Sequence, residues 1–346
     1  MFVFRLNLAV TYICNSRCRI CDIWKIYLKE PMKVKEELQL AQFELLFKGL
    51  PQLTWLHITG GEPFLRHDLV DIINLAVQNS KIMLLDTSTN GLDMHRVLST
   101  VEELLCTVKI PYFSIGVSFD GPQKLHDYVR GIPGSWEKTL KTLVALKELE
   151  KSYANFEVHI NYTISTYNAG NLAKMYQELI RYVDISRDNI SLSLEHKGIQ
   201  FQNFEGTSTI AQFKNNALKD IQYILNTSIN YAKCTKILQY IRTKFKREFV
   251  KLMLRYLDNP KEIIVPCEAC RLSVYVNPYG DFFPCTIWGI KLGNIKETEI
   301  KKILYSKLTK QVRNSIMSGK CPNCWSGCES WLSLLMHRAG KALFSL

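Results

Sequence analysis

Apolar positions recur along the first 200 residues with two periods, one typical of strands and one typical of helices. Runs rich in β-branched and aromatic residues predict strands at residues 2–12, 53–59, 81–88, 112–119, 156–164 and 189–195. Helical spacing predicts helices at residues 36–49, 67–78, 92–105, 135–150 and 169–182. This alternation predicts an α/β fold with a parallel sheet and right-handed crossovers, although periodicity does not separate an open doubly wound sheet from a barrel.

The alternation ends near residue 198, and a basic segment follows it. Residues 209–262 hold 11 Lys or Arg against 4 Asp or Glu, an excess of 7 positive charges. The pattern predicts a basic helix over residues 237–257 that packs one face on the rest of the fold and turns its cations to solvent. A helix at a membrane surface and a docking face for an anionic substrate or acidic peptide are the alternatives. Pro260 and Pro266 then mark the entry to a smaller C-terminal part.

The composition favours a cytoplasmic, metal-binding protein. The 346 residues are 47% hydrophobic, yet they contain neither a run of about 18 apolar residues nor the features of a signal peptide. Nine of the 11 cysteines fall in two tight groups, which favours metal binding over disulfides. The other two, Cys106 and Cys234, are predicted to be small buried side chains. The net charge of +12 favours an anionic partner, and we do not expect nucleic acid.

The first cysteine group, Cys14, Cys18 and Cys21, lies in a loop directly after the first predicted strand. Three thiolates at this spacing can converge on one centre, and such soft ligands favour iron–sulfur or zinc. A structural zinc ion normally takes a fourth Cys or His nearby, but the next histidine is His57. A cluster held by three cysteines instead leaves one iron open to a small molecule, as a catalytic cluster requires.

A second motif, Thr-Gly-Gly-Glu-Pro at residues 59–63, follows the next predicted strand. Glycines let backbone approach a ligand closely, and a carboxylate accepts hydrogen bonds from an ammonium group. Together the cysteine loop and this motif resemble the radical S-adenosylmethionine (radical SAM) family. The resemblance implies a partial (β/α)6 TIM-like barrel with the active site at the carboxyl ends of the strands. It also implies a catalytic 4Fe-4S cluster on the three cysteines, and S-adenosylmethionine with its amino group at Gly60, Gly61, Glu62 and Pro63.

Further motifs at the ends of later predicted strands resemble the same family. They are Thr89-Asn90-Gly91, and Ser118-Phe119-Asp120-Gly121-Pro122 followed by His126-Asp127 and Arg130-Gly131. The resemblance implies cofactor contacts from Ser88, Thr89, Asn90, Ser118, Arg130 and Thr163, with Asn168 near Thr163 and with Ile20 covering the adenine. For Asp120, His126 and Asp127, a hydrogen-bonded loop without a cofactor role is an equal alternative.

The second cysteine group resembles the SPASM and twitch domains that hold auxiliary iron–sulfur clusters in this family. It comprises Cys267, Cys270, Cys285, Cys321, Cys324 and Cys328. Six cysteines favour one auxiliary 4Fe-4S cluster over two, with zinc as the alternative. Four ligands cannot be chosen among the six: Cys270, Cys285, Cys321 and Cys324 are one set, and Cys267, Cys270, Cys285 and Cys328 another. We expect a barrel at residues 1–200, a basic bridging segment at 201–265 and the auxiliary-cluster domain at 266–346.

The resemblance implies an oxidoreductase that cleaves S-adenosylmethionine reductively to a 5′-deoxyadenosyl radical and removes hydrogen from a substrate. It also implies a flavodoxin- or ferredoxin-type electron donor, and an auxiliary cluster that makes the reaction a net oxidation. We favour a small-molecule or lipid- or sugar-linked substrate, because the spacing of Cys267, Cys270 and Cys285 is close to that of the molybdenum cofactor biosynthesis enzyme. A peptide- or protein-modifying maturase and a non-catalytic iron–sulfur electron carrier are the alternatives. No catalytic acid or base is assigned.

Overall fold

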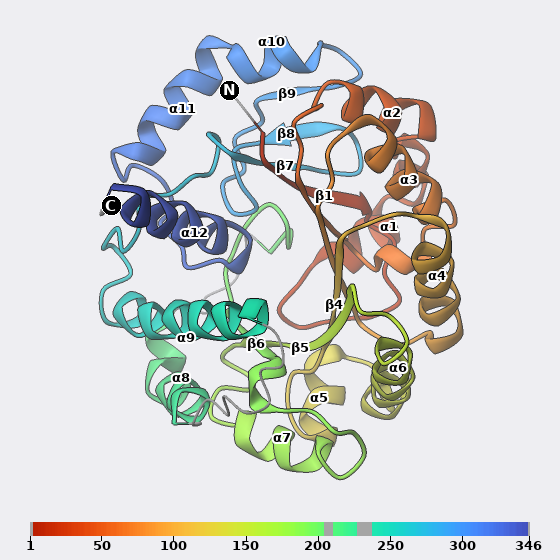
Figure 1. Ribbon diagram of the computed structural model, residues 1–346, viewed down its shortest axis with the longest axis vertical. Coiled ribbons are helices and arrows are strands. Elements are labelled where there is room, and N and C mark those ends of the chain that lie inside the picture. The colour runs from red at the N-terminus through yellow and green to blue at the C-terminus, as the bar shows by residue number, and fades with distance from the viewer. Residues whose placement is uncertain (1–2, 204–209, 227–236, 345–346) are drawn as a thin grey trace.

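The computed structural model describes residues 3–203, 210–226 and 237–344, and within these residues one nine-stranded sheet curves through the molecule (Figure 1). Its strand order is β6-β5-β4-β3-β2-β1-β7-β8-β9. The first six strands are β1 (Arg5–Thr11), β2 (Trp55–Gly60), β3 (Leu84–Thr89), β4 (Tyr112–Ser118), β5 (Phe156–Ile164) and β6 (Ile190–Leu194), and each is parallel to its neighbour. The predicted parallel α/β architecture is therefore confirmed.

Helices surround the curved sheet on its outer side (Figure 1). Those between the barrel strands are α1 (Ile26–Lys29), α2 (Leu40–Lys48), α3 (Leu69–Asn79), α4 (Met94–Thr107), α5 (Gln123–Arg130), α6 (Ser135–Glu150) and α7 (Leu172–Leu179). The predicted ranges of β5 and α6 match those of the structure, whereas α7 is shorter at both ends. The short helix α5 was not predicted, because polar residues dominate its sequence QKLHDYVR.

The strands bury apolar side chains against the helices and turn a polar face inward. In β5, Phe156, Val158, Ile160, Tyr162 and Ile164 are buried, and the residues between them alternate with these as the period of two requires. The alternating partners on the inner face are Glu157, His159, Asn161 and Thr163, and all four line one cavity. Barrels of this kind usually fill their interior with branched apolar side chains. Here a polar inner wall surrounds open space.

The C-terminal strands extend the sheet of the barrel. Strands β7 (Ser273–Val276) and β8 (Asp281–Phe283) form an antiparallel hairpin, and β9 (Gly293–Asn294) joins it. Strand β7 pairs in parallel with β1, from Arg5 opposite Ser273 to Leu8 opposite Val276. Three helices follow, α10 (Ile300–Tyr305), α11 (Lys307–Met317) and α12 (Gly327–Phe344). The second cysteine group is thereby joined to the barrel through its first strand.

The basic segment forms α8 (Ile210–Leu225) and α9 (Ile237–Asp258). As expected, α9 buries one face, which includes Phe249 and Met253, while Lys251 and Arg255 are exposed. The expectation that the cations face solvent was wrong for Lys246, which lines the interior cavity and donates to the Asp188 carbonyl.

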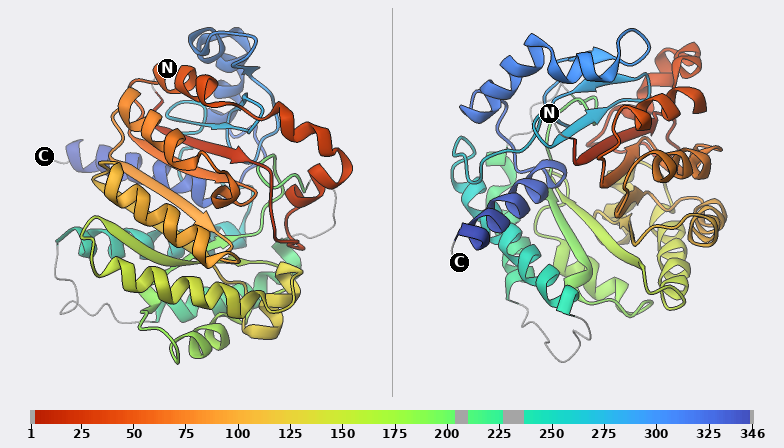
Figure 2. Two further views of the ribbon diagram at one scale, coloured as in Figure 1. Left: turned by 90° about the vertical axis from the view of Figure 1, so that its right-hand side faces the viewer. Right: turned by 45° about the horizontal axis from the view of Figure 1, so that its top comes forward.

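Helix α9 lies beside α12 (Figures 1 and 2). The ring of Phe249 on α9 stacks on that of Trp331 on α12, with the two ring centroids 4.8 Å apart. Within the described residues, no helix combines the length and the apolarity needed to cross a membrane.

The prediction for the two isolated cysteines was wrong for Cys106, which is exposed on α4. That helix buries Val97, Val101 and Leu104. Cys106 comes two residues after Leu104 and so lies about 200° around the helix from it, on the solvent side. Its sulfur lies 3.6 Å from the hydroxyl of Tyr153. Cys234 lies outside the described residues.

Candidate functional site

A cavity of about 510 Å³ extends along the inside of the barrel, from the first residues of strands such as β2 and β3 to the loops at the carboxyl ends. The residues predicted from sequence for the catalytic cluster and for S-adenosylmethionine line it with one exception: Cys14, Cys18, Ile20, Cys21, Gly60, Gly61, Glu62, Pro63, Ser88, Thr89, Asn90, Ser118, Arg130 and Thr163. The exception is Asn168, which does not line the cavity, because its side chain is buried and hydrogen bonded to the backbone of Thr163 and Ser165. The predicted residues that line the cavity come from the ends of five strands and from the loops that follow, as the active sites of barrels do. The parallel sheet therefore brings together residues that are up to 149 positions apart, from Cys14 to Thr163.

The cysteine loop is held by backbone contacts with the carboxyl end of α5. The amides of Arg17 and Arg19 donate to the carbonyls of Arg130 (3.0 Å) and Val129 (2.9 Å). Gly131 has φ +67°, and a Cβ there would lie 2.4 Å from the carbonyl oxygen of Arg17. A glycine is thus needed after Arg130 both for the left-handed backbone and for the close approach of the loop.

Arg130 lies between the cysteine loop and a buried carboxylate. Its Nε is 2.7 Å from Asp120 Oδ2, and its guanidinium donates to Cys18 Sγ at 3.6 Å. Asp120 is therefore a structural partner of Arg130. His126 is fully buried and accepts a hydrogen bond from the Asp120 amide, while Asp127 caps the start of α6 through the amides of residues 134 and 136. For these three residues the contacts favour the hydrogen-bonded loop.

Residues 60–63 lie directly against the cysteine loop. The amides of Gly61 and Glu62 donate to the carbonyls of Thr11 and Ile13, each at 2.8 Å. A Cβ on Gly61 would lie 2.3 Å from the Ile13 oxygen. The sequence suggested that these glycines allow a ligand to come close. In the structure they also let the two backbone segments meet.

The Glu62 carboxylate is buried beside the end of β3. It accepts hydrogen bonds from the Asn90 amide (2.7 Å), the Thr89 hydroxyl (3.0 Å) and the Phe64 amide (3.3 Å). Burial raises the pKa of Glu62 to about 7, although the three donors oppose the shift. A carboxyl group with this pKa gains its full charge when a cation, such as an ammonium group, comes close.

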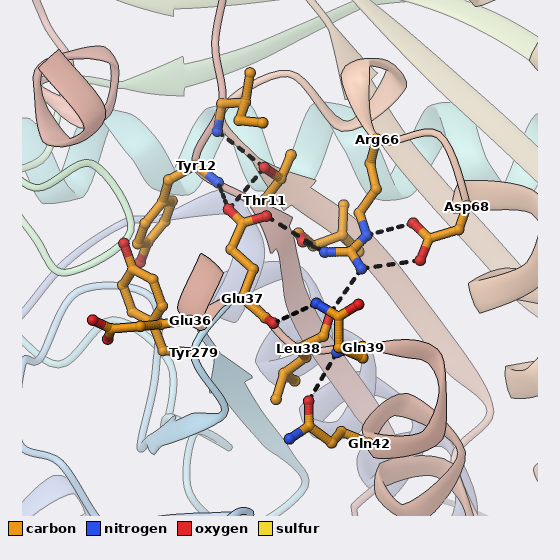
Figure 3. A network of polar contacts seen from close by, with 12 residues as sticks. Thr11, Tyr12, Glu36, Glu37, Leu38, Gln39, Gln42, Arg66, Asp68 and Tyr279 are labelled. Atoms are coloured by element: carbon orange, nitrogen blue, oxygen red, sulfur yellow. Dashed lines mark hydrogen bonds and ion pairs between the residues drawn. The ribbon is translucent and has the colours of Figure 1, made fainter. Parts of the chain in front are cut away.

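A buried ionic network fixes the strand end that leads into the cysteine loop (Figure 3). Glu37 accepts hydrogen bonds from the Thr11 hydroxyl (2.8 Å) and the Tyr12 amide (2.7 Å). Arg66 donates to the Val10 carbonyl at 2.8 Å and binds Asp68 through two nitrogens, at 2.7 and 3.0 Å. The last residues of β1 are therefore held by side chains from two other segments before the chain reaches Cys14.

The cysteines of the second group lie around the start of α12, and one of them reaches the cavity. Cys270 and Cys285 are buried, and Cys328 lines the cavity with its sulfur 3.7 Å from Gln200 Oε1. Burial raises the pKa of Cys324 to about 12, and the charges of the neighbouring Cys321 and Cys328 contribute. Burial likewise raises the pKa of Cys14 in the first group to about 12. Because thiols bind metals as thiolates, loading either group must release protons.

Two family models match the chain. The Radical SAM superfamily model matches residues 8–179, and the model of the SPASM iron–sulfur cluster-binding domain matches residues 267–326. The chain belongs to the radical SAM superfamily. It is a radical SAM enzyme with a C-terminal SPASM region, and its cofactors are a 4Fe-4S cluster, S-adenosylmethionine and auxiliary iron–sulfur clusters.

Curated and solved relatives of this radical SAM enzyme differ in the molecules for which they are named. GTP 3′,8-cyclase of Shewanella denitrificans is 38% identical over 90 residues, 25% of this chain and 25% of that protein. AdoMet-dependent heme synthase of Oleidesulfovibrio alaskensis is 23% identical over 339 residues, 91% of this chain and 78% of that protein. The solved structure of anSMEcpe with bound AdoMet and the Cp18Cys peptide has a TM-score of 0.57 at 18% identity and covers 90% of this chain and 83% of that one. The chain spans less than half the length of the GTP 3′,8-cyclases it matches.

The donor set of this radical SAM enzyme suits clusters better than single ions. Within the described residues no three His, Cys, Asp or Glu side chains converge closely enough for one metal ion. The ligands of a zinc ion all lie about 2.0–2.3 Å from it. The thiolates of a cluster bind different irons and stand further apart. The three cysteines of the first group line the same cavity as Glu62, which fits the ligands of a cluster better than those of a single zinc ion.

Sequence reasoning missed the inner wall of the barrel below the cofactor residues. His57 Nδ1 is hydrogen bonded to Asp86 Oδ2, and Trp55 Nε1 donates to Asp86 Oδ1. Burial opposes the charge of His57, but Asp86 outweighs it and raises the His57 pKa to about 10. Burial and the nearby Lys246 of α9 lower the His159 pKa to about 4. The alternating polar residues of β5 already indicate a polar inner face, but function was predicted only for residues at the ends of strands.

Proposed function

We propose that this enzyme removes a hydrogen atom from a small polar molecule, or from the polar part of a lipid- or sugar-linked one, in a net oxidation. The observation that carries the proposal is the polar inner wall of the cavity. Asp86, Glu157, His159 and Lys246 all line it, and such groups would be costly to bury against an apolar substrate. The relatives named for GTP and heme support the same class, because both molecules are small.

The residues of the site divide into three roles in this proposal. Cys14, Cys18 and Cys21, which line the cavity, would hold the catalytic cluster. Glu62 orients the cofactor through its ammonium group, while Ser88, Thr89, Asn90, Ser118, Arg130, Thr163 and Ile20 line the rest of its binding surface. When bound, the cluster and S-adenosylmethionine supply a one-electron cleavage that yields a hydrogen-abstracting radical, and the protein supplies position and exclusion of water.

Two electrons leave the substrate in the proposed oxidation. One would leave as a hydrogen atom to the radical that the bound cofactor supplies, the other would pass to the auxiliary cluster held by the second cysteine group, and the second hydrogen would be released as a proton to water. Cys328 lines the same cavity as Cys18, which supports a short path from substrate to the second cysteine group. The electron that starts each turnover comes from a flavodoxin- or ferredoxin-type donor, which the net charge of +12 would attract if the donor is acidic.

Anaerobic reconstitution tests the proposal. The reconstituted protein should contain about eight iron atoms per chain, four for each of two clusters. With dithionite and S-adenosylmethionine it should form 5′-deoxyadenosine above the level of a Cys14→Ala control. Equal 5′-deoxyadenosine in both would favour the non-catalytic electron carrier and overturn the enzyme mechanism proposed here.

The substrate class is tested by fractions of a cell extract. Addition of the small-molecule fraction should accelerate 5′-deoxyadenosine formation and yield a compound that lacks two hydrogens. Acceleration by peptide fractions alone would instead support the peptide-modifying alternative. A Cys328→Ala variant serves as the matched control, because it should still form 5′-deoxyadenosine but not the oxidised compound.

A further inference from the structure

Glu329 is a buried carboxylate at the start of α12, directly after Cys328. It is 2% exposed. Its Oε1 accepts hydrogen bonds from Asn7 Nδ2 and from the Thr286 amide, both at 3.2 Å. Its Oε2 accepts one from the Ser273 hydroxyl at 2.7 Å. The carboxylate therefore joins three segments that are remote in sequence: β1, the turn after β8, and β7.

Two of these three contacts, those of Thr286 and Ser273, lie next to a cysteine of the second group. Thr286 directly follows Cys285, and the carbonyl of Ser273 accepts a hydrogen bond from the Cys270 amide at 2.8 Å. The Ser333 hydroxyl extends the connection, because it donates to the Glu329 carbonyl (2.8 Å) and accepts from the amide of Glu268, the neighbour of Cys267 (3.0 Å). The surroundings of Glu329 thus reach the backbone beside four of the six cysteines.

A further contact ties the start of α12 to the barrel. Arg5 NH1 donates to the carbonyl of Cys328 at 2.6 Å, and Arg5 is itself only 3% exposed. Arg5 and Asn7 are alternate residues of β1 and therefore point to the same side of the strand. The first strand of the barrel thus holds the helix start that carries Cys328 and Glu329.

A carboxylate among cysteines could serve as a cluster ligand or as an anchor. Three donors already occupy the two oxygens of Glu329, and an iron ligand would have to give up some of them. The lost hydrogen bonds would leave buried donors unsatisfied, which costs stability. The geometry therefore favours the anchor.

We propose that Glu329 is the positioning residue of the auxiliary centre. It fixes the segments of Cys270, Cys285 and Cys328 against β1, and loading of the auxiliary cluster depends on it. The inference rests on the auxiliary cluster of the proposed function and adds a residue outside the cysteine motif. It predicts that the second cysteine group loses its cluster when the anchor is removed, whereas the first group does not.

The test compares iron and sulfide contents of reconstituted variants. Glu329→Ala removes all three acceptor contacts, and it should lose about half of the iron, the share of one of two clusters. Glu329→Gln should keep most of it, because the amide oxygen can still accept from Asn7 and Thr286 while its NH2 donates to the Ser273 oxygen. Glu299→Ala, at an exposed carboxylate of the same region, should match the wild type. Wild-type iron in Glu329→Ala would overturn the proposal.

Two further measurements keep the outcome decisive. If Glu329→Ala does not fold, Ser273→Ala takes its place, because it removes the hydroxyl that donates to Glu329 Oε2. Ser273→Ala should contain less auxiliary iron than Glu329→Gln. Equal iron contents in these two variants would count against the anchor. Substrate-free 5′-deoxyadenosine formation is measured in the wild type alongside the iron contents, because it depends on the first cysteine group. Absence of 5′-deoxyadenosine in the wild type would refute the proposed function. The iron contents of the variants would still show whether loading of the auxiliary cluster depends on Glu329.

Discussion

Replacement of Arg66 by methionine should destabilise the protein strongly. Among the residues drawn in Figure 3, Arg66 is the only cation that contacts the two buried carboxylates, Glu37 and Asp68. The side chain of Arg66 is 6% exposed, and those of Glu37 and Asp68 are 7% and 9% exposed. Removal of one partner from a buried ion pair costs about 3–5 kcal/mol, since the remaining charges stay buried without compensation. The carbonyls of Val10 and Leu38 would each lose a donor as well.

Urea unfolding of the cluster-free protein under anaerobic conditions measures this effect. A loss of about 4 kcal/mol is a large part of the 5–15 kcal/mol typical of a folded protein, so the midpoint should fall clearly. Arg66→Lys should recover only part of the loss, because a lysine cannot bind Asp68 through two nitrogens. Arg181→Met, at an exposed arginine, should change the free energy of unfolding by less than about 0.5 kcal/mol. A loss below about 1 kcal/mol in Arg66→Met would refute the reasoning.

Three further substitutions test the site. Glu62 has its pKa raised by burial from 4.5 to about 7. The folded cofactor-free protein should therefore lose up to about 3 kcal/mol of stability as the pH rises from about 5 to 8, and Glu62→Gln should remove that part of the slope in urea unfolding. Gly61→Ala places a Cβ against the Ile13 carbonyl and should lower the iron content of the first cysteine group, measured with Cys285→Ala as background. Lys246→Met should raise the His159 pKa above about 4 in an NMR titration, whereas Lys251→Met on the exposed side of α9 should leave it unchanged.

The parts of the site that could be predicted from sequence are those in which short-range spacing determines position. The carboxyl ends of parallel strands meet at one edge of the sheet, so a motif that follows a predicted strand is placed by the fold class alone. This is why residues as distant as Cys14, Glu62 and Arg130 were assigned to one site, and all three line the cavity. The barrel, the family and the cofactors were implied by the resemblance of these motifs to the radical SAM family rather than by spacing alone, and all three predictions are confirmed.

The features that escaped prediction depend on pairing between distant segments or on the rotation of a helix. The prediction for Cys106 was wrong because a single cysteine in a helix does not indicate whether its side chain faces the core or solvent. That orientation is determined by which face of α4 is buried in the folded protein. The parallel pairing of β7 with β1 joins residues more than 260 positions apart, and no local pattern encodes such a register. The positions of Cys328 at the cavity and of Glu329 in its network follow from that pairing.

Strand β1 connects the two cysteine groups physically. Near its start, Arg5 and Asn7 bind Cys328 and Glu329, and at its end Thr11 binds the carboxylate of Glu37 just before the loop of Cys14. From Asn7 to Thr11 a strand rises by about 13 Å, and both ends of that span are held by buried side chains. The distance between the two centres is therefore set by one short, buried segment rather than by a flexible linker. A one-residue insertion between Asn7 and Ala9, which regular pairing with His57 and Thr59 places on one face, would turn one of them to the other face, so the contacts at the two ends of the segment could not both be kept.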